Sequence, residues 1–366
     1  MVLCANPQPD NNEALVNWES IPLDVRRGVT FLRNQPGITK VILYGGSGGG
    51  PTMTFYQAVA ENGPSYCQGP KKLVQCGDNL AGLPPADGIV LRDAHPGNGV
   101  NTLRAINPAV FNENRPDLLN PALDPFNPEN GYNPNGPSTY SENFKKRYFN
   151  AQARRLARLT DKALEIKRLI EAGEYIYPDN AAFVIGRAGG SQAGGGAGAN
   201  LFELDLSILC CTVKPQKLLK NDGTIVTEVV RSVRVPDLTL DEQSATFDEG
   251  AKLLTITSFL SANTIRATDS IDYEQIDWCS SNNSTPCAVE NISVPILIGA
   301  MGAHYFIRDS ELFYEKAKST DKDLIVVEGA THGITPCTAC EQFPGQYSNT
   351  VRNFFDYIAA WINARF

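Results

Sequence analysis

The chain has 366 residues, a formal net charge of −8, 42% hydrophobic residues and 20% charged residues. This acidic balance gives no electrostatic attraction to nucleic acid or anionic lipid, so no nucleic-acid partner is expected. No stretch approaches the roughly 18 apolar residues of a membrane-spanning helix, so no membrane span is expected. The one basic cluster, residues 145–158, alternates with apolar positions and is typical of the solvated face of a helix.

The first part of the chain predicts alternating strands and helices. Residues 2–5 form a short apolar run that predicts a strand, and residues 23–34 predict a helix with apolar side chains on one face. A strand is predicted over residues 41–44, a helix over residues 52–61, and a buried strand over residues 88–91. Such alternation predicts a parallel α/β sheet.

The alternation breaks down between residues 96 and 290. A region rich in proline and asparagine, residues 107–137, is followed by a long predicted helix over residues 142–172. The glycine tract at 186–198 lacks the lysine of a phosphate-binding loop, so a flexible loop is expected. Because residues 96–290 lie between two strands of the sheet, we interpret them as a mainly helical cap over its carboxyl ends.

The alternation returns near the C-terminus. Strands are predicted over residues 294–298 and 324–327, with a helix over residues 310–318 between them. Residues 350–366 carry apolar and aromatic side chains at helical spacing, which is typical of a helix that seals one face of a sheet.

The strand at 41–44 runs directly into Gly45-Gly46-Ser47-Gly48-Gly49. A Gly-x-Ser-x-Gly sequence between a strand and a helix predicts a nucleophile elbow, a sharp turn that holds a serine at its tip. The glycines are needed because a Cβ there would collide with neighbouring backbone. The alternative is a mobile glycine loop.

A serine hydroxyl becomes a nucleophile only beside a base, and the chain has three histidines. His332 follows the last predicted strand in a Gly-x-x-His-Gly turn, and we expect it to be this base. His95 and His304 also follow predicted strands, so we expect them to line the pocket.

With these motifs the chain resembles the serine hydrolases of the α/β-hydrolase fold. The resemblance implies an α/β fold class: a mostly parallel sheet with helices on both faces and a large, mainly helical cap insertion. It covers a core of residues 1–95 and 291–366, whereas the cap at 96–290 matches nothing in the family.

The resemblance also implies roles for individual residues. Ser47 would be the nucleophile, His332 the base, and the backbone N–H of Gly48 an oxyanion-hole donor. The implied activity is cleavage of an ester, or less readily an amide, in a small-molecule substrate through an acyl-enzyme, with no cofactor and no metal.

Two residues are candidates for the acid that orients His332. The family's commonest arrangement places it after the strand that precedes the histidine strand, but His304 occupies that place and Asp309 follows a few residues later. A variant takes the acid from the end of the strand after the nucleophile helix, where Asp93 stands. We expect Asp93, which would hold the imidazole tautomer, and keep Asp309 as the alternative.

Only 46 residues precede Ser47, enough for one strand and one helix. The family places more strands there, together with a loop that supplies a second oxyanion-hole donor. The strand at 41–44 is therefore expected to lack a neighbour on one side. Losing one donor costs roughly 3 kcal/mol of transition-state stabilisation. We expect an N-terminally shortened form of a longer protein, donors from the cap, or impaired catalysis.

Two other functions stay open. Asp93, His95 and His304 follow neighbouring strands and could serve a metal-dependent hydrolase. A non-catalytic binding protein built on the same scaffold would explain a missing oxyanion loop.

The nine cysteines leave the compartment open. Pairing Cys67 with Cys76, and Cys279 with Cys287, would close two short polar loops. The Cys337-Thr-Ala-Cys340 motif lacks a second pair at metal-ligand spacing, so a structural pair is favoured over zinc. Three Asn-x-Ser/Thr acceptors would suit a secretory protein, but no signal peptide is visible.

Overall fold

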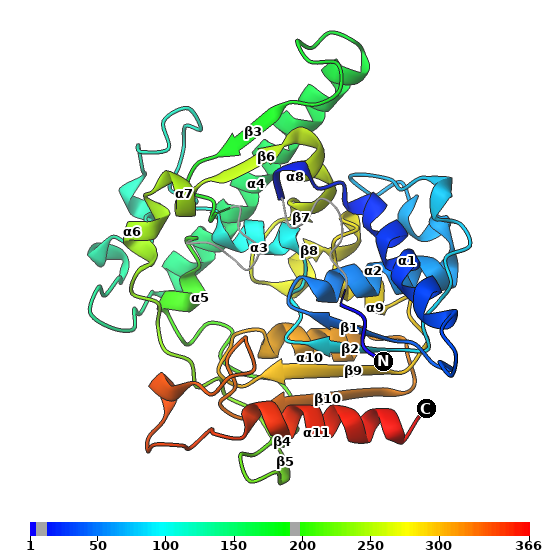
Figure 1. Ribbon diagram of the computed structural model, residues 1–366. Helices are drawn as coiled ribbons and strands as arrows, with labels where there is room; N and C mark the ends of the chain where they lie inside the picture. The colour runs from blue at the N-terminus through cyan, green and yellow to red at the C-terminus, as the bar shows by residue number, and fades with distance from the viewer. Residues whose placement is uncertain (5–12, 191–197) are drawn as a thin grey trace.

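The computed structural model describes residues 1–4, 13–190 and 198–366 (Figure 1). Its centre is a sheet with the strand order β1-β2-β9-β10-β4-β5, in which all neighbours are parallel except β4 and β5. The strands are β1 (Ile42–Gly46), β2 (Gly88–Arg92), β4 (Gln216–Leu219), β5 (Ile225–Glu228), β9 (Ile296–Met301) and β10 (Lys322–Val327). The chain therefore has the mixed α/β class and mostly parallel sheet that the alternating elements predicted.

Helices cover both faces of this sheet (Figure 1). Because strand residues alternate between faces, Leu43, Ile89 and Ile298 join one hydrophobic cluster, whereas Val90 and Leu297 join another. The first cluster includes residues of α1 (Ile21–Arg33), α2 (Gly49–Asn62), α9 (Thr285–Val289) and α10 (Ile307–Lys316), and the second includes residues of α11 (Thr350–Asn363). Burial on two faces explains the nearly continuous apolar runs in these strands.

A second group of elements lies above the sheet in Figure 1. Its longest helix, α4 (Glu142–Glu171), packs its buried face against α8 (Ile256–Ala262). The remaining elements are α3 (Asn98–Ala105), α5 (Leu201–Leu204), α6 (Leu240–Ser244), α7 (Phe247–Gly250), β3 (Ala182–Ile185), β6 (Lys252–Thr255), β7 (Arg266–Ala267) and β8 (Ile276–Asp277). In the described part of the chain, no helix combines the length and apolar character needed to span a membrane.

Two strands from the stretch between β2 and β9 complete the central sheet. β4 pairs in parallel with β10, and β5 then pairs with β4 in antiparallel fashion. The prediction that all of residues 96–290 form a cap is wrong for these two strands, which the sequence did not predict. All four residues of β5 are exposed, so no buried face imposes an apolar alternation on its sequence.

β1 is an edge strand: within the described residues its only neighbour is β2. The sequence analysis expected this position from the few residues that precede Ser47. Tyr44, in the middle of β1, remains 42% exposed. The strand that leads to Ser47 is thus held on one side only.

Two predicted segments are described only in part. Val2, Leu3 and Cys4 are not in a strand, so the predicted strand is wrong there, and residue 5 lies outside the described residues. Of the glycine tract at 186–198, residues 191–197 also lie outside them.

Disulfides close several short loops. The pairs Cys67–Cys76 and Cys279–Cys287 form as the loop spacing suggested. The other two pairs are Cys210–Cys211 and Cys337–Cys340. The Cys337-Thr-Ala-Cys340 motif is therefore a structural pair, as favoured over a zinc site.

Candidate active site

The turn after β1 holds Ser47 in the left-handed region, with φ of 52°. The Ser47 N–H donates to the Arg92 carbonyl at 3.1 Å, and its carbonyl accepts from the Gly50 N–H at 2.9 Å. Gly45 permits this close turn, because a Cβ there would lie 2.5 Å from the Gly49 oxygen. The geometry is that of a strained strand-to-helix turn at the carboxyl end of the sheet, with α2 beginning two residues after the serine.

Ser47, His332 and Asp93 form one chain of hydrogen bonds. Ser47 Oγ lies 2.9 Å from His332 Nε2, and His332 Nδ1 lies 2.6 Å from Asp93 Oδ2. The three residues follow β1, β10 and β2, which all end at the same edge of the parallel sheet. When Nδ1–H donates to the carboxylate, Nε2 is free of a proton and can accept one from the serine hydroxyl.

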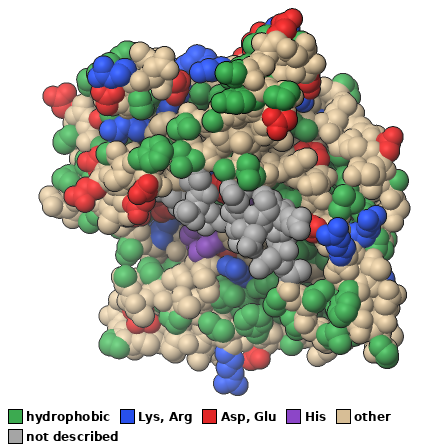
Figure 2. All heavy atoms as spheres, turned by 45° about the horizontal axis from the view of Figure 1, so that its top comes forward, with side chains coloured by type: hydrophobic (Ala, Val, Ile, Leu, Met, Phe, Trp, Pro, Cys, Tyr) green, Lys and Arg blue, Asp and Glu red, His purple; other side chains and the backbone are tan. Residues whose placement is uncertain are grey.

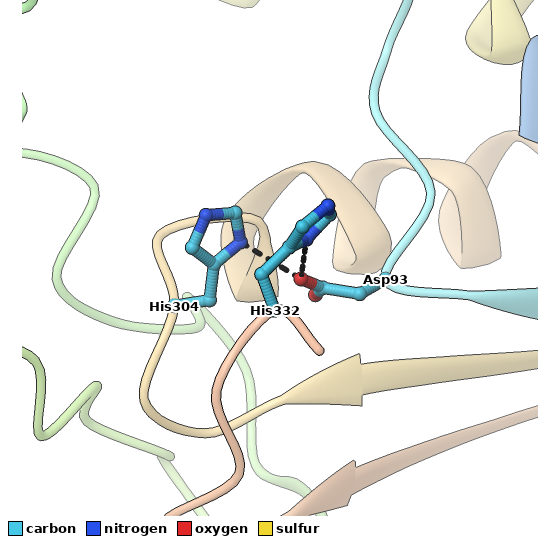
Figure 3. Close-up of side chains that lie close together, drawn as sticks. All are labelled: Asp93, His304 and His332. Carbon is cyan, nitrogen blue, oxygen red and sulfur yellow. Dashed lines mark hydrogen bonds and ion pairs between the residues drawn. The ribbon is translucent and has the colours of Figure 1, made fainter. Parts of the chain in front are cut away.

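Asp93 is buried, and Figure 3 shows that His304 and His332 both approach its carboxylate. Its Oδ2 also lies 2.8 Å from His304 Nδ1, and its Oδ1 accepts from the Met301 N–H at 3.1 Å. The His304 contact is close but lacks hydrogen-bond alignment. Burial by itself raises the pKa of Asp93, but the His304 and His332 imidazoles outweigh it and lower the pKa to about 2. The carboxyl group is therefore ionised at neutral pH.

The loop that carries His332 is fastened to the sheet. Arg92, the last residue of β2, donates from Nη1 to the His332 carbonyl at 2.5 Å. The rings of His304 and Phe306 lie 4.7 and 5.7 Å from the His332 ring, measured between centroids. The His332 side chain is still 34% exposed, so the ring is oriented by its neighbours but remains open to a substrate.

Asp309, the alternative acid, has other partners. Its two oxygens accept from Nη1 and Nη2 of Arg104 at 3.1 Å each, and Oδ1 also accepts from the Tyr273 hydroxyl at 2.8 Å. Among the described residues no hydrogen bond joins Asp309 to His332. Of the two candidates, Asp93 is the one in contact with the histidine.

A small pocket of about 50 Å³ lies over Ser47. It is lined from the loops after β2, β9 and β10, from α3 and from the start of α5. Figure 2 shows histidine side chains reaching the surface where the sheet region meets the elements above it. A larger cavity of about 240 Å³, lined by Asn17, Lys167 and Leu260 among others, contains no histidine. The pocket at Ser47 is therefore the candidate active site because of the side chains that line it, although its volume is smaller.

His95 and His304 both line this pocket, as the sequence analysis expected. His95 is 5% exposed, and its Nδ1 accepts a hydrogen bond from the Gly97 N–H at 3.1 Å. Burial lowers the pKa of His95 to about 3, with a further contribution from the charge of His332. The ring is therefore neutral at physiological pH.

The metal set considered from the sequence, Asp93, His95 and His304, is not assembled as a whole. In the described part of the chain the possible ligand atoms of Asp93, His304 and His332 lie within 4.8 Å of one another, without His95. The 2.6 Å between His332 Nδ1 and Asp93 Oδ2 is a hydrogen-bond distance. Two ligands on one tetrahedral zinc, each bonded at about 2.0 Å, would stand roughly 3.3 Å apart. The geometry fits a shared proton better than a shared metal.

Comparisons with known proteins do not name a family. No protein-family model matches the chain, and no curated protein matches it. Among solved structures the chain is similar to the crystal structure of hypothetical protein PA2218 from Pseudomonas aeruginosa. The TM-score is 0.34 and the identity 14%, with 98% of this chain and 71% of that chain covered. A likeness this weak carries no argument, so function has to be argued from the side chains.

Proposed function

We propose that this protein is a serine hydrolase of the α/β-hydrolase fold that cleaves an ester bond, or less readily an amide bond. The proposal is carried by one observation, the hydrogen-bond chain from Ser47 Oγ through His332 to the buried carboxylate of Asp93. The strained turn at Ser47 and the burial of Asp93 support it. In this proposal the elements above the sheet act as a large cap over the pocket.

The first step forms an acyl-enzyme. Ser47 Oγ attacks the substrate carbonyl carbon while its proton moves to His332 Nε2, and the carbonyl electron pair moves onto oxygen. Asp93 stabilises the imidazolium that results and stays ionised. The backbone N–H of Gly48 donates to the oxyanion. When the C–O bond to the leaving group breaks, His332 Nε2 returns the proton to the departing alkoxide.

The second step releases the acid product. Water attacks the acyl carbon and gives a proton to His332 Nε2, forming a second tetrahedral intermediate. Its collapse breaks the bond to Ser47 Oγ, which takes the proton back. Each group returns to its starting state, so neither an oxidant nor a cofactor is needed.

The size of the pocket limits the substrate. Within the described residues, a volume of about 50 Å³ beside Ser47 accommodates a short acyl group. The substrate class that we propose is therefore a small ester with an acyl part near the size of acetyl. p-Nitrophenyl acetate is a suitable first substrate.

A fluorophosphonate probe tests the proposal because it reacts only with an activated serine. We expect labelling of the folded wild-type protein, and none of Ser47→Ala or of heat-denatured wild type. Hydrolysis of p-nitrophenyl acetate should fall by roughly 10⁴-fold or more in Ser47→Ala. A folded wild-type protein that is neither labelled nor active would overturn the proposal in favour of a non-catalytic binding protein.

A further inference from the structure

The oxyanion formed on Ser47 requires donors, and the Gly48 N–H is only one. Removing a single donor from an oxyanion hole costs roughly 10²- to 10³-fold in kcat, so a second donor is worth seeking. Within the described residues no strand lies on the outer side of β1 that could carry a donor loop to the site. Among the described residues, the side chains that border Ser47 come from the loops after β2, β9 and β10, from α3 and from the start of α5.

His95 lies beside both the nucleophile and Gly48. Its backbone N–H donates to the Ser47 carbonyl at 3.3 Å, which links the two residues directly. Its Nε2 lies 3.3 Å from the position that a Cβ of Gly48 would occupy. His95 also lines the same pocket as Ser47 and His332. His95 Nε2 therefore lies close to Gly48, the residue that follows the nucleophile.

The tautomer of His95 is set by Gly97. Because the Gly97 N–H donates to Nδ1, that nitrogen has no proton, and the proton of the neutral ring is on Nε2. In the described part of the chain Nε2 makes no hydrogen bond. The residue as a whole is 5% exposed, but Nε2 is not one of the described buried side-chain atoms that lack a partner, which fits a donor that reaches the pocket.

Neighbouring backbone holds the ring in this orientation. Gly97 has φ of 140°, and a side chain there would collide with the Asn283 carbonyl. The Thr285 hydroxyl donates to the His95 carbonyl at 2.9 Å, and the Thr285 N–H donates to the Pro96 carbonyl at 3.0 Å. The turn that carries His95 is preorganised, as an oxyanion donor must be.

We propose that His95 is the second oxyanion-hole donor, with its Nε2–H and the Gly48 N–H together binding the negative oxygen of the tetrahedral intermediates. The inference rests on the proposed function and adds a catalytic residue to it. His95 keeps its proton throughout: the electron pair of the carbonyl moves onto oxygen, and Nε2–H donates a hydrogen bond to that oxygen. A neutral ring suits this role because it donates without losing its proton.

Two substitutions separate the two ring nitrogens. His95→Asn places its side-chain oxygen near the position of Nδ1, so it can still accept from Gly97, but it removes the distal donor. His95→Gln places an amide N–H near the position of Nε2 and gives up the acceptor for Gly97. Together the two variants test whether the Nε2–H donor or the acceptor contact with Gly97 is needed for catalysis.

We expect kcat for p-nitrophenyl acetate to fall by about 10²- to 10³-fold in His95→Asn, with KM changed less than about threefold. His95→Gln should recover at least about tenfold of that loss. The affinity for a trifluoromethyl ketone, which forms a tetrahedral oxyanion on the serine, should fall in parallel with kcat/KM. Thermal unfolding of each variant shows that the protein compared is folded.

The outcomes distinguish this inference from the proposed function. Wild-type protein that reacts with the fluorophosphonate, while folded His95→Asn hydrolyses the ester at the wild-type rate, overturns the role of His95 alone. The same holds if His95→Gln is as slow as His95→Asn with both folded, because a distal N–H donor would then recover none of the lost rate. Absence of labelling in the wild type overturns the proposed function and this inference together.

Discussion

Two fully buried carboxylates lie near the pocket, and their surroundings differ in one respect. Asp93 contacts the imidazoles of His332 and His304, whereas Asp309 is held by the guanidinium of Arg104. A guanidinium is always charged, while an imidazole gains and loses a proton near neutral pH. Burial and a nitrogen-bearing partner are therefore common to both residues. What distinguishes Asp93 is a partner whose charge can change during a reaction.

Asp309 instead connects two parts of the structure. Asp309 belongs to α10, which packs on the sheet, and Arg104 belongs to α3 in the region above. The Tyr273 hydroxyl adds a third hydrogen bond to the same carboxylate. This buried ion pair joins the two parts of the molecule beside the pocket. In the proposed mechanism Asp93 supports proton transfer at His332, whereas Asp309 joins α10 to α3.

The sharpest test of this contrast is Asp93→Asn. An amide at this position cannot stabilise the imidazolium and favours the wrong tautomer of His332, so kcat should fall by roughly 10⁴-fold. Hydrolysis of p-nitrophenyl acetate measures this loss, and fluorophosphonate labelling should slow as well. A loss below about tenfold would mean that Asp93 is not the acid partner.

Asp309→Asn should have the opposite effects, a large loss of stability and a small change in kcat. Leaving Arg104 buried without its counterion should lower the free energy of unfolding by about 3–5 kcal/mol. In the folded protein kcat should change by less than about tenfold, because no hydrogen bond connects Asp309 to His332. Urea unfolding and ester hydrolysis on the same samples measure both quantities. A large loss of kcat without a loss of stability would make Asp309 the catalytic acid.

The pH dependence of stability should also separate the two acids. The folded pKa of Asp93, about 2, lies below its ordinary value of 3.8, so the unfolded chain binds more protons between these values. Asp93 therefore stabilises the fold above pH 3.8, and this contribution of roughly 2 kcal/mol is lost as pH falls towards 2.

Urea unfolding between about pH 5 and pH 2 measures this contribution. Asp93→Asn is the matched control. Its free energy of unfolding should depend less steeply on pH between about pH 5 and pH 2. His304→Phe removes the neighbour that lowers the pKa of Asp93 most, so the loss of stability should be smaller and should end at a higher pH. If the free energy of unfolding depended on pH as steeply in Asp93→Asn as in the wild type, the contrast between the two carboxylates would be contradicted.

The smallest expected effect is at Arg92. Arg92→Met removes the hydrogen bond to the His332 carbonyl and loosens the ring that faces Asp93, so kcat should fall by about tenfold. Arg92→Lys, which keeps one donor, should recover part of this loss. Unchanged kcat in Arg92→Met would show that Asp93 alone is sufficient to orient His332.

Much of the sheet was predictable because its strands are apolar on both faces and are bounded by glycine and polar turns. β4 and β5 were missed, since they are short and β5 is wholly exposed. The Asn221-Asp222-Gly223 sequence between them is a turn signal that could have found this hairpin.

The candidate site was predictable where the signal is local. Ser47 carries its own turn sequence, and His332 and Asp93 each end a strong strand pattern. The choice between Asp93 and Asp309 was not settled, because it depends on Arg104, a partner about 200 positions away in the chain whose contact no spacing encodes. The role inferred for His95 likewise depends on a contact that spacing does not encode, the hydrogen bond that the Gly97 N–H donates to His95 Nδ1.

The Cys279–Cys287 disulfide closes the loop that contains Asn283 and Thr285, and both residues contact the turn that carries His95. The turn beside the oxyanion is therefore fastened to a covalent ring of side chain and backbone. Cys287 also belongs to a hydrophobic cluster, so the same covalent ring links the packed interior to the turn. If the proposed function holds, reduction of this disulfide should slow hydrolysis by giving that turn more conformational freedom.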